Sequence, residues 1–148
     1  MSIQVRISDT DRVDRLLGKM PIALREKTLI KAVRKAARIV AKEASRQAPK
    51  PGYVGDVPGL PALSKNIKAV VRTKGDSVAG FVGPTYPAAP HGHLVEFGHE
   101  AVFWGNRTEG RRVEGKPYLR PAADETESAQ QQAIITTLKA EIGKLADK

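Results

Sequence analysis

Apolar residues recur with a helical period over a long segment between Pro21 and Gln47. At about 100° per residue, one side of this segment carries Leu29, Val33, Ala36, Val40 and Ala44. The opposite side is almost purely basic and carries Lys27, Lys31, Arg34, Lys35, Arg38, Lys42 and Arg46. Pro49 and Pro51 follow the segment and prevent a helix from continuing through them. The pattern therefore predicts a long amphipathic helix over residues 21–47 with one basic face.

Two further segments have a helical period. Near the end of the chain, an apolar stripe is formed by Ala133, Ile134, Leu138, Ile142 and Leu145. This stripe predicts a terminal helix over about 117–145, in which Pro121 is tolerated only within the first turn. A short helix is predicted over residues 9–18, where Asp9 or Thr10 would cap its start and Gly18 would end it.

Alternating or β-branched apolar runs predict the strands. Residues 3–7 alternate strictly, and the runs 66–73 and 77–83 flank a Lys-Gly-Asp turn, which is typical of a β-hairpin. Residues 93–98 (HLVEFG) are a further strand candidate, and residues 102–104 are expected to continue the sheet after a turn.

Proline, glycine and charge interrupt these elements at three places. The segments 48–64 and 84–92 are rich in proline and glycine, and 105–116 is polar and charged. We expect all three to project from the core, the last as an exposed loop or the tip of a hairpin. The whole chain, residues 1–148, is predicted to be one α+β domain. Its small, mainly antiparallel sheet is expected to pack against the helix at 21–47 and the terminal helix at 118–145.

Charge is unevenly distributed along the chain. The formal net charge is +9, but residues 1–50 hold 13 basic and 5 acidic side chains, whereas residues 51–148 hold 12 and 11. The excess thus belongs to the first third and indicates an anionic partner there, either nucleic acid or an acidic protein surface. The chain lacks cysteine, which excludes disulfides and cysteine catalysis. No apolar run is long enough for a bilayer and no signal pattern opens the chain, so we expect a soluble protein without a membrane partner.

The sequence offers no catalytic constellation. Glu96 lies in an apolar run without a second carboxylate at a motif spacing, so a structural ion pair with an arginine such as Arg120, or a helix cap, is favoured over acid–base chemistry. The histidines at 91, 93 and 99 lack a zinc-binding spacing, and no glycine-rich turn matches a nucleotide motif. We therefore expect no enzyme activity, no metal and no cofactor. Tyr118 and Leu119 are expected to anchor the last helix by core packing, with a subunit interface as the alternative.

Three short segments resemble a known protein family. The first is the V-E-F-G run of Val95, Glu96, Phe97 and Gly98. The second is the P-Y-L-R-P run of Pro117, Tyr118, Leu119, Arg120 and Pro121, where the family more often has Phe at the second place. The third is the alanine pattern of residues 37–44, followed by Ala48 and Pro49. In this order and spacing, over residues 20–145, the chain resembles the neck or tail-completion proteins of phages with long non-contractile tails, which also occur in prophages and gene transfer agents.

The resemblance implies a structural virion protein, assembled in the bacterial host cytoplasm, that forms a ring at the head–tail junction. A six-fold ring is favoured over a twelve-fold one, with the connector or stopper and the tail tube as neighbours and DNA passing through the opening. It does not decide between a neck ring and a tail-terminator ring. The V-E-F-G and P-Y-L-R-P motifs would then lie at subunit interfaces, and the basic helix face would meet DNA or an acidic partner. The alternative is a nucleic-acid-binding module without sequence specificity, which uses the basic helix directly.

Overall fold

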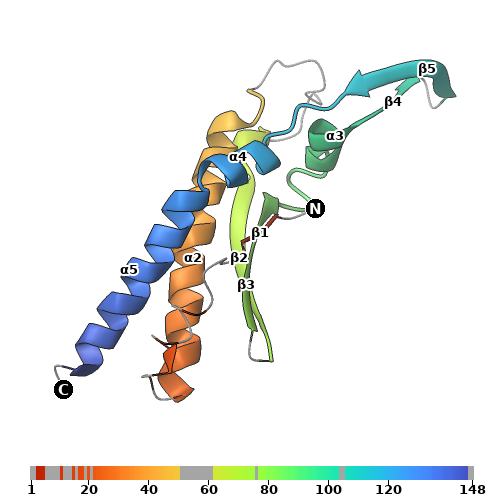
Figure 1. Ribbon diagram of the computed structural model, residues 1–148. Coiled ribbons are helices and arrows are strands. Elements are labelled where there is room, and N and C mark those ends of the chain that lie inside the picture. Colours follow the sequence, from red (N-terminus) through yellow and green to blue (C-terminus); the bar gives the residue numbers. More distant parts are fainter. Residues whose placement is uncertain are drawn as a thin grey trace.

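The computed structural model describes residues 3–5, 11, 15, 17, 18, 20, 22–50, 62–75, 77–103 and 106–146. The elements are, in chain order, β1 (Ile3–Val5), α2 (Ile22–Gln47), the 3-10 helix η1 (Leu63–Lys65), β2 (Ile67–Lys74), β3 (Ser77–Pro84), α3 (Gly92–Phe97), β4 (Gly98–Phe103), β5 (Asn106–Glu114), α4 (Leu119–Glu125) and α5 (Glu127–Ala146). Long helices and small antiparallel sheets make this an α+β fold, which confirms the predicted class (Figure 1).

The central element is α2, which forms as predicted and is covered on two sides. Its fully buried positions are mostly alanine, so neighbouring backbones can approach it closely. On one side, Ala37, Val40 and Ala44 pack into the main core with residues of the sheet and α4. On the other side, Ala32 and Ala36 pack against α5 in a second cluster.

The predicted hairpin of β2 and β3 is confirmed. The strands pair from Ile67 opposite Pro84 to Lys74 opposite Ser77, and Gly75 in the tight turn has a φ of 56°, which glycine adopts without strain. Strand β1 pairs with the other edge of β3, giving the order β1-β3-β2. This sheet lies along α2, and Gly80 permits the contact, because a Cβ there would lie 3.0 Å from Val33 Cγ1.

The C-terminal helix differs from the prediction in two ways. It is divided into α4 and α5, and the break at Thr126 is stabilised by the Thr126 hydroxyl, which donates to the Ala122 carbonyl at 2.6 Å. The Gln130 side chain also donates to the Ala123 carbonyl at 2.9 Å. Moreover, α5 packs on α2 and not on the sheet, so the predicted sheet contact is made by α4 alone. Pro121 lies in the first turn of α4, as expected.

Two predictions are wrong around residues 92–116. Residues 92–97 form the helix α3 where a strand was predicted. The charged segment 105–116 is not a loop or hairpin tip, because residues 106–114 are the strand β5. Strands β4 and β5 pair antiparallel as a separate two-stranded sheet and do not extend the first. In Figure 1 this pair, which we call the arm, projects away from the helices and the first sheet.

Several predictions fall wholly or partly outside the described residues. Only positions 11, 15, 17 and 18 of the helix predicted at 9–18 are described; the first three are helical and Gly18 is in a turn. The structure does not describe residues 6 and 7 of the first predicted strand, nor residues 51–61 of the loop predicted at 48–64. At the end of that loop, residue 62 precedes η1 and residues 63 and 64 belong to it. The segment between β3 and α3 is irregular, as predicted for 84–92, and contains a cis bond before Pro87.

Candidate functional site

The predicted basic face of α2 is present and exposed. From Lys27 to Arg46, the exposed residues of this helix are all lysine or arginine. They are the seven predicted residues, Lys27, Lys31, Arg34, Lys35, Arg38, Lys42 and Arg46, which we call the basic stripe. Its i,i+4 neighbours carry like charge, and each such pair costs roughly 0.2–0.5 kcal/mol of helix stability. A cationic row of this kind attracts anions by the field it creates.

Two members of the basic stripe have carboxylate partners in the described structure. Lys31 reaches across to Glu141 of α5 at 2.5 Å, and this bond together with the one from Lys144 lowers the pKa of Glu141. Arg46 pairs with Glu43 one turn earlier and lies 3.8 Å from Glu125. The hydrogen bonds from Arg46, and then from Gln47, lower the pKa of Glu43 to about 2.

The other five members have no ion-pair partner among the described residues. They are Lys27, Arg34, Lys35, Arg38 and Lys42. Because a helix rises about 1.5 Å and turns about 100° per residue, these five lie within an arc of about 100° along about 22 Å of α2. Both flanks of the helix are covered by packed elements, so this arc is its open side.

The two motifs meet at the base of the arm, around the carboxylate of Glu96. This side chain is buried, with an exposed fraction of 5%. Its Oε2 accepts hydrogen bonds from the backbone N–H groups of Tyr118 at 2.8 Å and Leu119 at 3.0 Å. Its Oε1 accepts one from the backbone N–H of Arg120 at 3.3 Å. The carboxylate thus caps the start of α4, where unpaired N–H groups and the helix dipole both favour a negative charge.

This arrangement decides between the two structural roles predicted for Glu96. The cap is present, whereas the described bonds to Arg120 come from its backbone and not from its guanidinium. The Arg120 side chain is exposed. A carboxylate 22 residues before the cap position gives no local capping pattern, so the sequence alone could not identify which helix it serves.

Tyr118 belongs to the core, which was the favoured alternative for this residue. It is fully buried together with Leu119, and its hydroxyl donates to the Gly92 carbonyl at 3.4 Å. Burial raises the pKa of the Tyr118 phenol well above its usual value, and the charge of Glu96 adds to this effect. The phenol is therefore neutral, and it fastens α3 to the start of α4.

Two glycines let the arm leave this junction. Gly98 has a φ of 73°, and a Cβ at this position would lie 2.4 Å from the Val113 carbonyl oxygen. Directly after the facing strand β5, a Cβ at Gly115 would lie 2.7 Å from the Glu96 carbonyl oxygen. The Lys116 N–H also donates to the Val95 carbonyl at 2.7 Å. The V-E-F-G run therefore combines a buried cap with a turn that only glycine fits.

The remaining motif residues differ in exposure. Val95 is half-buried and packs against the main core, and Pro121 is also half-buried. Phe97 and Pro117 are exposed, and the exposed fraction of Phe97, 57%, is high for an aromatic ring. The motifs thus form one junction between core and arm, and Phe97 is the apolar side chain that this junction presents to its surroundings.

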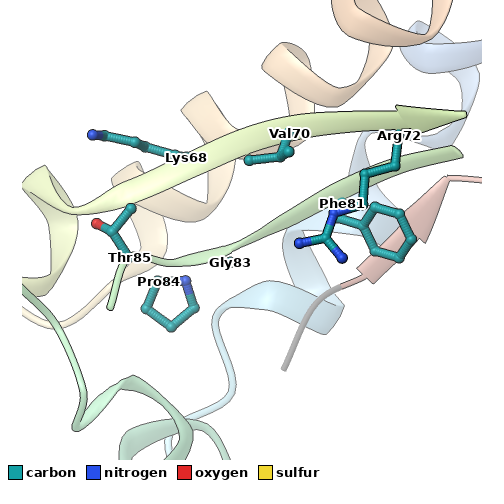
Figure 2. A pocket seen from close by; sticks show the side chains of 7 residues that line it. All are labelled: Lys68, Val70, Arg72, Phe81, Gly83, Pro84 and Thr85. Carbon is teal, nitrogen blue, oxygen red and sulfur yellow. The ribbon is translucent and has the colours of Figure 1, made fainter. Parts of the chain in front are cut away.

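A groove that the sequence did not reveal lies on the open face of the first sheet. It has a volume of about 290 Å³ and is lined by Lys68, Val70, Arg72, Phe81, Gly83, Pro84 and Thr85. Figure 2 shows these side chains along β2 and β3, and the Arg72 guanidinium lies 5.6 Å from the centre of the Phe81 ring. Alternate residues of paired strands share a face, but only the hairpin register brings Arg72 and Phe81 together. The groove combines an apolar floor with two cations.

Other candidate sites find no support in the described part of the chain. His91 is buried and His93 exposed, and no group of three or more histidine, cysteine or acidic side chains is placed to hold a metal ion there. Nor does any helix among these residues have both the length and the apolar character needed to cross a membrane.

Comparison with known proteins gives one family. The model of the family described as "Bacteriophage HK97-gp10, putative tail-component" matches residues 11–98, which is more than half of the chain. The matched segment includes α2, the hairpin of β2 and β3 and the V-E-F-G run, whereas β1 lies before it and β5, α4 and the P-Y-L-R-P run lie beyond it. Searches among curated proteins and among solved structures return no match.

Proposed function

We propose that this chain, which belongs to the HK97-gp10-like family of bacteriophage tail components, forms a ring at the head–tail junction. Membership makes it a structural component of a phage tail, and hence a part of the virion that contacts other virion proteins. The proposal adds the ring, its position between the connector and the tail tube, and the passage of DNA through it.

The arm is the observation that carries the ring. It is a two-stranded sheet outside both hydrophobic clusters of the described residues. A two-stranded sheet is marginally stable in water without further strands or a helix packed on it. Its base, by contrast, is joined to the core by the Glu96 cap and by the hydrogen bond from the Lys116 N–H to the Val95 carbonyl. An arm that joins neither cluster of the described residues is suited to lie on a neighbouring subunit.

The layered arrangement supports a ring over a two-fold dimer. The open face of the first sheet and the outer side of α5 lie on opposite sides of α2 (Figure 1). Contacts between opposite faces of identical subunits are head-to-tail, and such contacts close into a ring when the rotation per subunit divides a full turn. A ring of six subunits is favoured and one of twelve is the alternative. Assembly in the host cytoplasm would precede incorporation into a phage or gene-transfer-agent particle.

Mass measurement of the purified full-length chain tests the ring, combined with a variant of the arm. We expect a discrete oligomer, and we expect the double substitution Arg111→Glu and Arg112→Glu to convert it into folded monomer, because both side chains are exposed on β5. The matched control replaces both arginines by lysine, which keeps the charge. If the native chain stays monomeric at all concentrations and is absent from purified particles, the proposal fails.

The alternative, a nucleic-acid-binding module that does not assemble, is separated by the same measurement. It predicts a monomer that binds duplex DNA tightly without forming any discrete oligomer. The basic stripe is compatible with both functions, but the family match and the oriented arm favour the structural one.

A further inference from the structure

We infer that the basic stripe of α2 is a contact surface for the sugar-phosphate backbone of duplex DNA. This inference rests on the proposed ring, since it assigns the open side of α2 to the DNA passage. The observation that carries it is the composition of that side: the exposed residues between Lys27 and Arg46 are basic without exception.

Most cations of the basic stripe have no carboxylate partner within the described structure, which supports binding of an anionic molecule outside the chain. Lys31 and Arg46 already have carboxylate partners, Glu141 and Glu43. The five members between and beside them have none among the described residues. Neither Glu26 nor Glu43 interrupts the row, because at about 100° per residue both point away from its centre. An external polyanion can neutralise these five cations together.

The chemistry of the basic stripe favours nucleic acid over an acidic protein. Protein–protein interfaces have a core with apolar or aromatic residues, and lysine is depleted from them. The exposed row from residue 27 to residue 46 contains four lysines, three arginines and no apolar or aromatic side chain. The more exposed apolar side chains lie elsewhere, at Phe97, Tyr86 and Val70, whereas Leu24, one turn before the row on α2, is exposed by 36%. Protein contacts are therefore better served by these other surfaces.

The same composition indicates which form of nucleic acid is bound. Proteins that hold single strands stack bases on aromatic side chains, and the row has none. Reading of bases requires polar groups that enter a groove, whereas a straight row of lysine and arginine serves contacts with phosphates. We therefore expect binding to duplex DNA without sequence preference, which suits a molecule that moves through a passage.

Salt dependence gives a quantitative test. The logarithm of the binding constant falls with the logarithm of salt concentration with a slope of about −0.9 per neutralised phosphate. Five contacts predict a slope of about −4.5 and a loss of affinity of about 500-fold between 50 and 200 mM salt. Substituting Arg38→Gln and Lys42→Gln removes two contacts, so the slope should change to about −2.7 and the loss to about 40-fold.

The experiment uses the full-length chain and a fluorescent duplex of random sequence, with anisotropy measured at several salt concentrations. The matched control is Lys50→Gln with Lys65→Gln, which removes the same charge from exposed positions outside the basic stripe and the groove. Glutamine is a good helix former, so α2 should persist in the stripe variant, and circular dichroism checks this. We expect the control to keep the native slope while the stripe variant loses about 1.8 units of it.

The result that overturns the inference is an equal slope for the native chain and the stripe variant, or an equal loss in the stripe variant and the control. If the stripe variant kept its slope but no longer entered particles, the surface would contact an acidic virion protein and DNA contact would be rejected. Sedimentation of the same samples distinguishes this inference from the ring proposal. If the stripe variant forms intact rings and its salt-dependence slope equals that of the native chain, this inference is refuted and the ring proposal is unaffected.

Discussion

Replacing Glu96 by alanine tests whether one buried carboxylate holds the arm junction to the core. The substitution leaves three backbone N–H groups at the start of α4 without their acceptor. Loss of a helix cap costs about 0.5–2 kcal/mol, and each buried donor left unpaired costs about 1–3 kcal/mol. Since the bond from Arg120 is long and only partly buried, we expect a total loss of about 3–4 kcal/mol in the free energy of unfolding.

Equilibrium unfolding in urea measures this loss, and two further variants define its cause. Glu96→Gln keeps the size and one carbonyl acceptor but removes the charge and turns an amide donor toward an N–H group, so we expect about 2 kcal/mol. Glu114→Ala removes an exposed carboxylate from the nearby strand β5. This control should change stability by less than about 0.5 kcal/mol.

Hydrogen exchange supplies a second, local readout of the Glu96 cap. In Glu96→Ala the amides of Tyr118 and Leu119 should exchange much faster, because their acceptor is gone. Amides in the middle of α2 should slow or quicken only as global stability changes. The capping argument is refuted if Glu96→Ala costs no more than Glu114→Ala, or if exchange at the start of α4 stays as in the native chain.

Three further predictions address the junction and the ion pairs. Thermal unfolding should show that Gly98→Ala destabilises the chain by more than about 2 kcal/mol, because the position has a positive φ and a Cβ there would clash with the backbone. The matched control Gly143→Ala lies in open space on α5 and should stabilise the chain by about 0.5–1 kcal/mol. Burial raises the pKa of Tyr118, so its neutral form stabilises the fold below pH ~10 and that stability is lost as the pH rises further; Tyr118→Phe should flatten this alkaline decline. The pKa of Glu43, about 2 in the native chain, should rise toward its usual value in Arg46→Met, as followed by the NMR shift of its carboxyl carbon; an unchanged midpoint would contradict the Arg46 assignment.

The elements with long, regular periods could be predicted from the sequence. The helix at 22–47 and the hairpin at 67–84 follow from hydrophobic spacing and a turn containing Gly75, because each buries one defined face. The basic stripe could be found in the same way, since the residues opposite a buried helical face must be exposed. Helical spacing alone thus fixed which seven cations would share a surface.

Elements fixed by contacts between distant residues could not be predicted. The run at 93–98 has too few residues to distinguish a strand from a helix, and its helical form is fixed by Glu96, Gly98 and the facing Gly115. Strand β5 has the sequence NRTEGRRVE without apolar alternation, so the sequence alone predicts a loop, and only the pairing with β4 identifies a strand. The break at Thr126 depends on side-chain bonds to backbone carbonyls, which leave the apolar period of the terminal helix unchanged.

The alanines of α2 connect the packing of the core to the open cationic surface. A helix that packs on one neighbour can bury large side chains on a single face. In contrast, α2 packs between two clusters, with Ala32 and Ala36 on one flank and Ala37 and Ala44 on the other. With both flanks occupied by small residues, the remaining arc receives most of the charged side chains of the helix, and Glu26 and Glu43 lie outside it. Mixed charges would serve solubility equally well and would add favourable i,i+4 pairs. The chain instead has one sign throughout this arc and accepts the repulsion, so the arc is better explained by an anionic partner than by solvation.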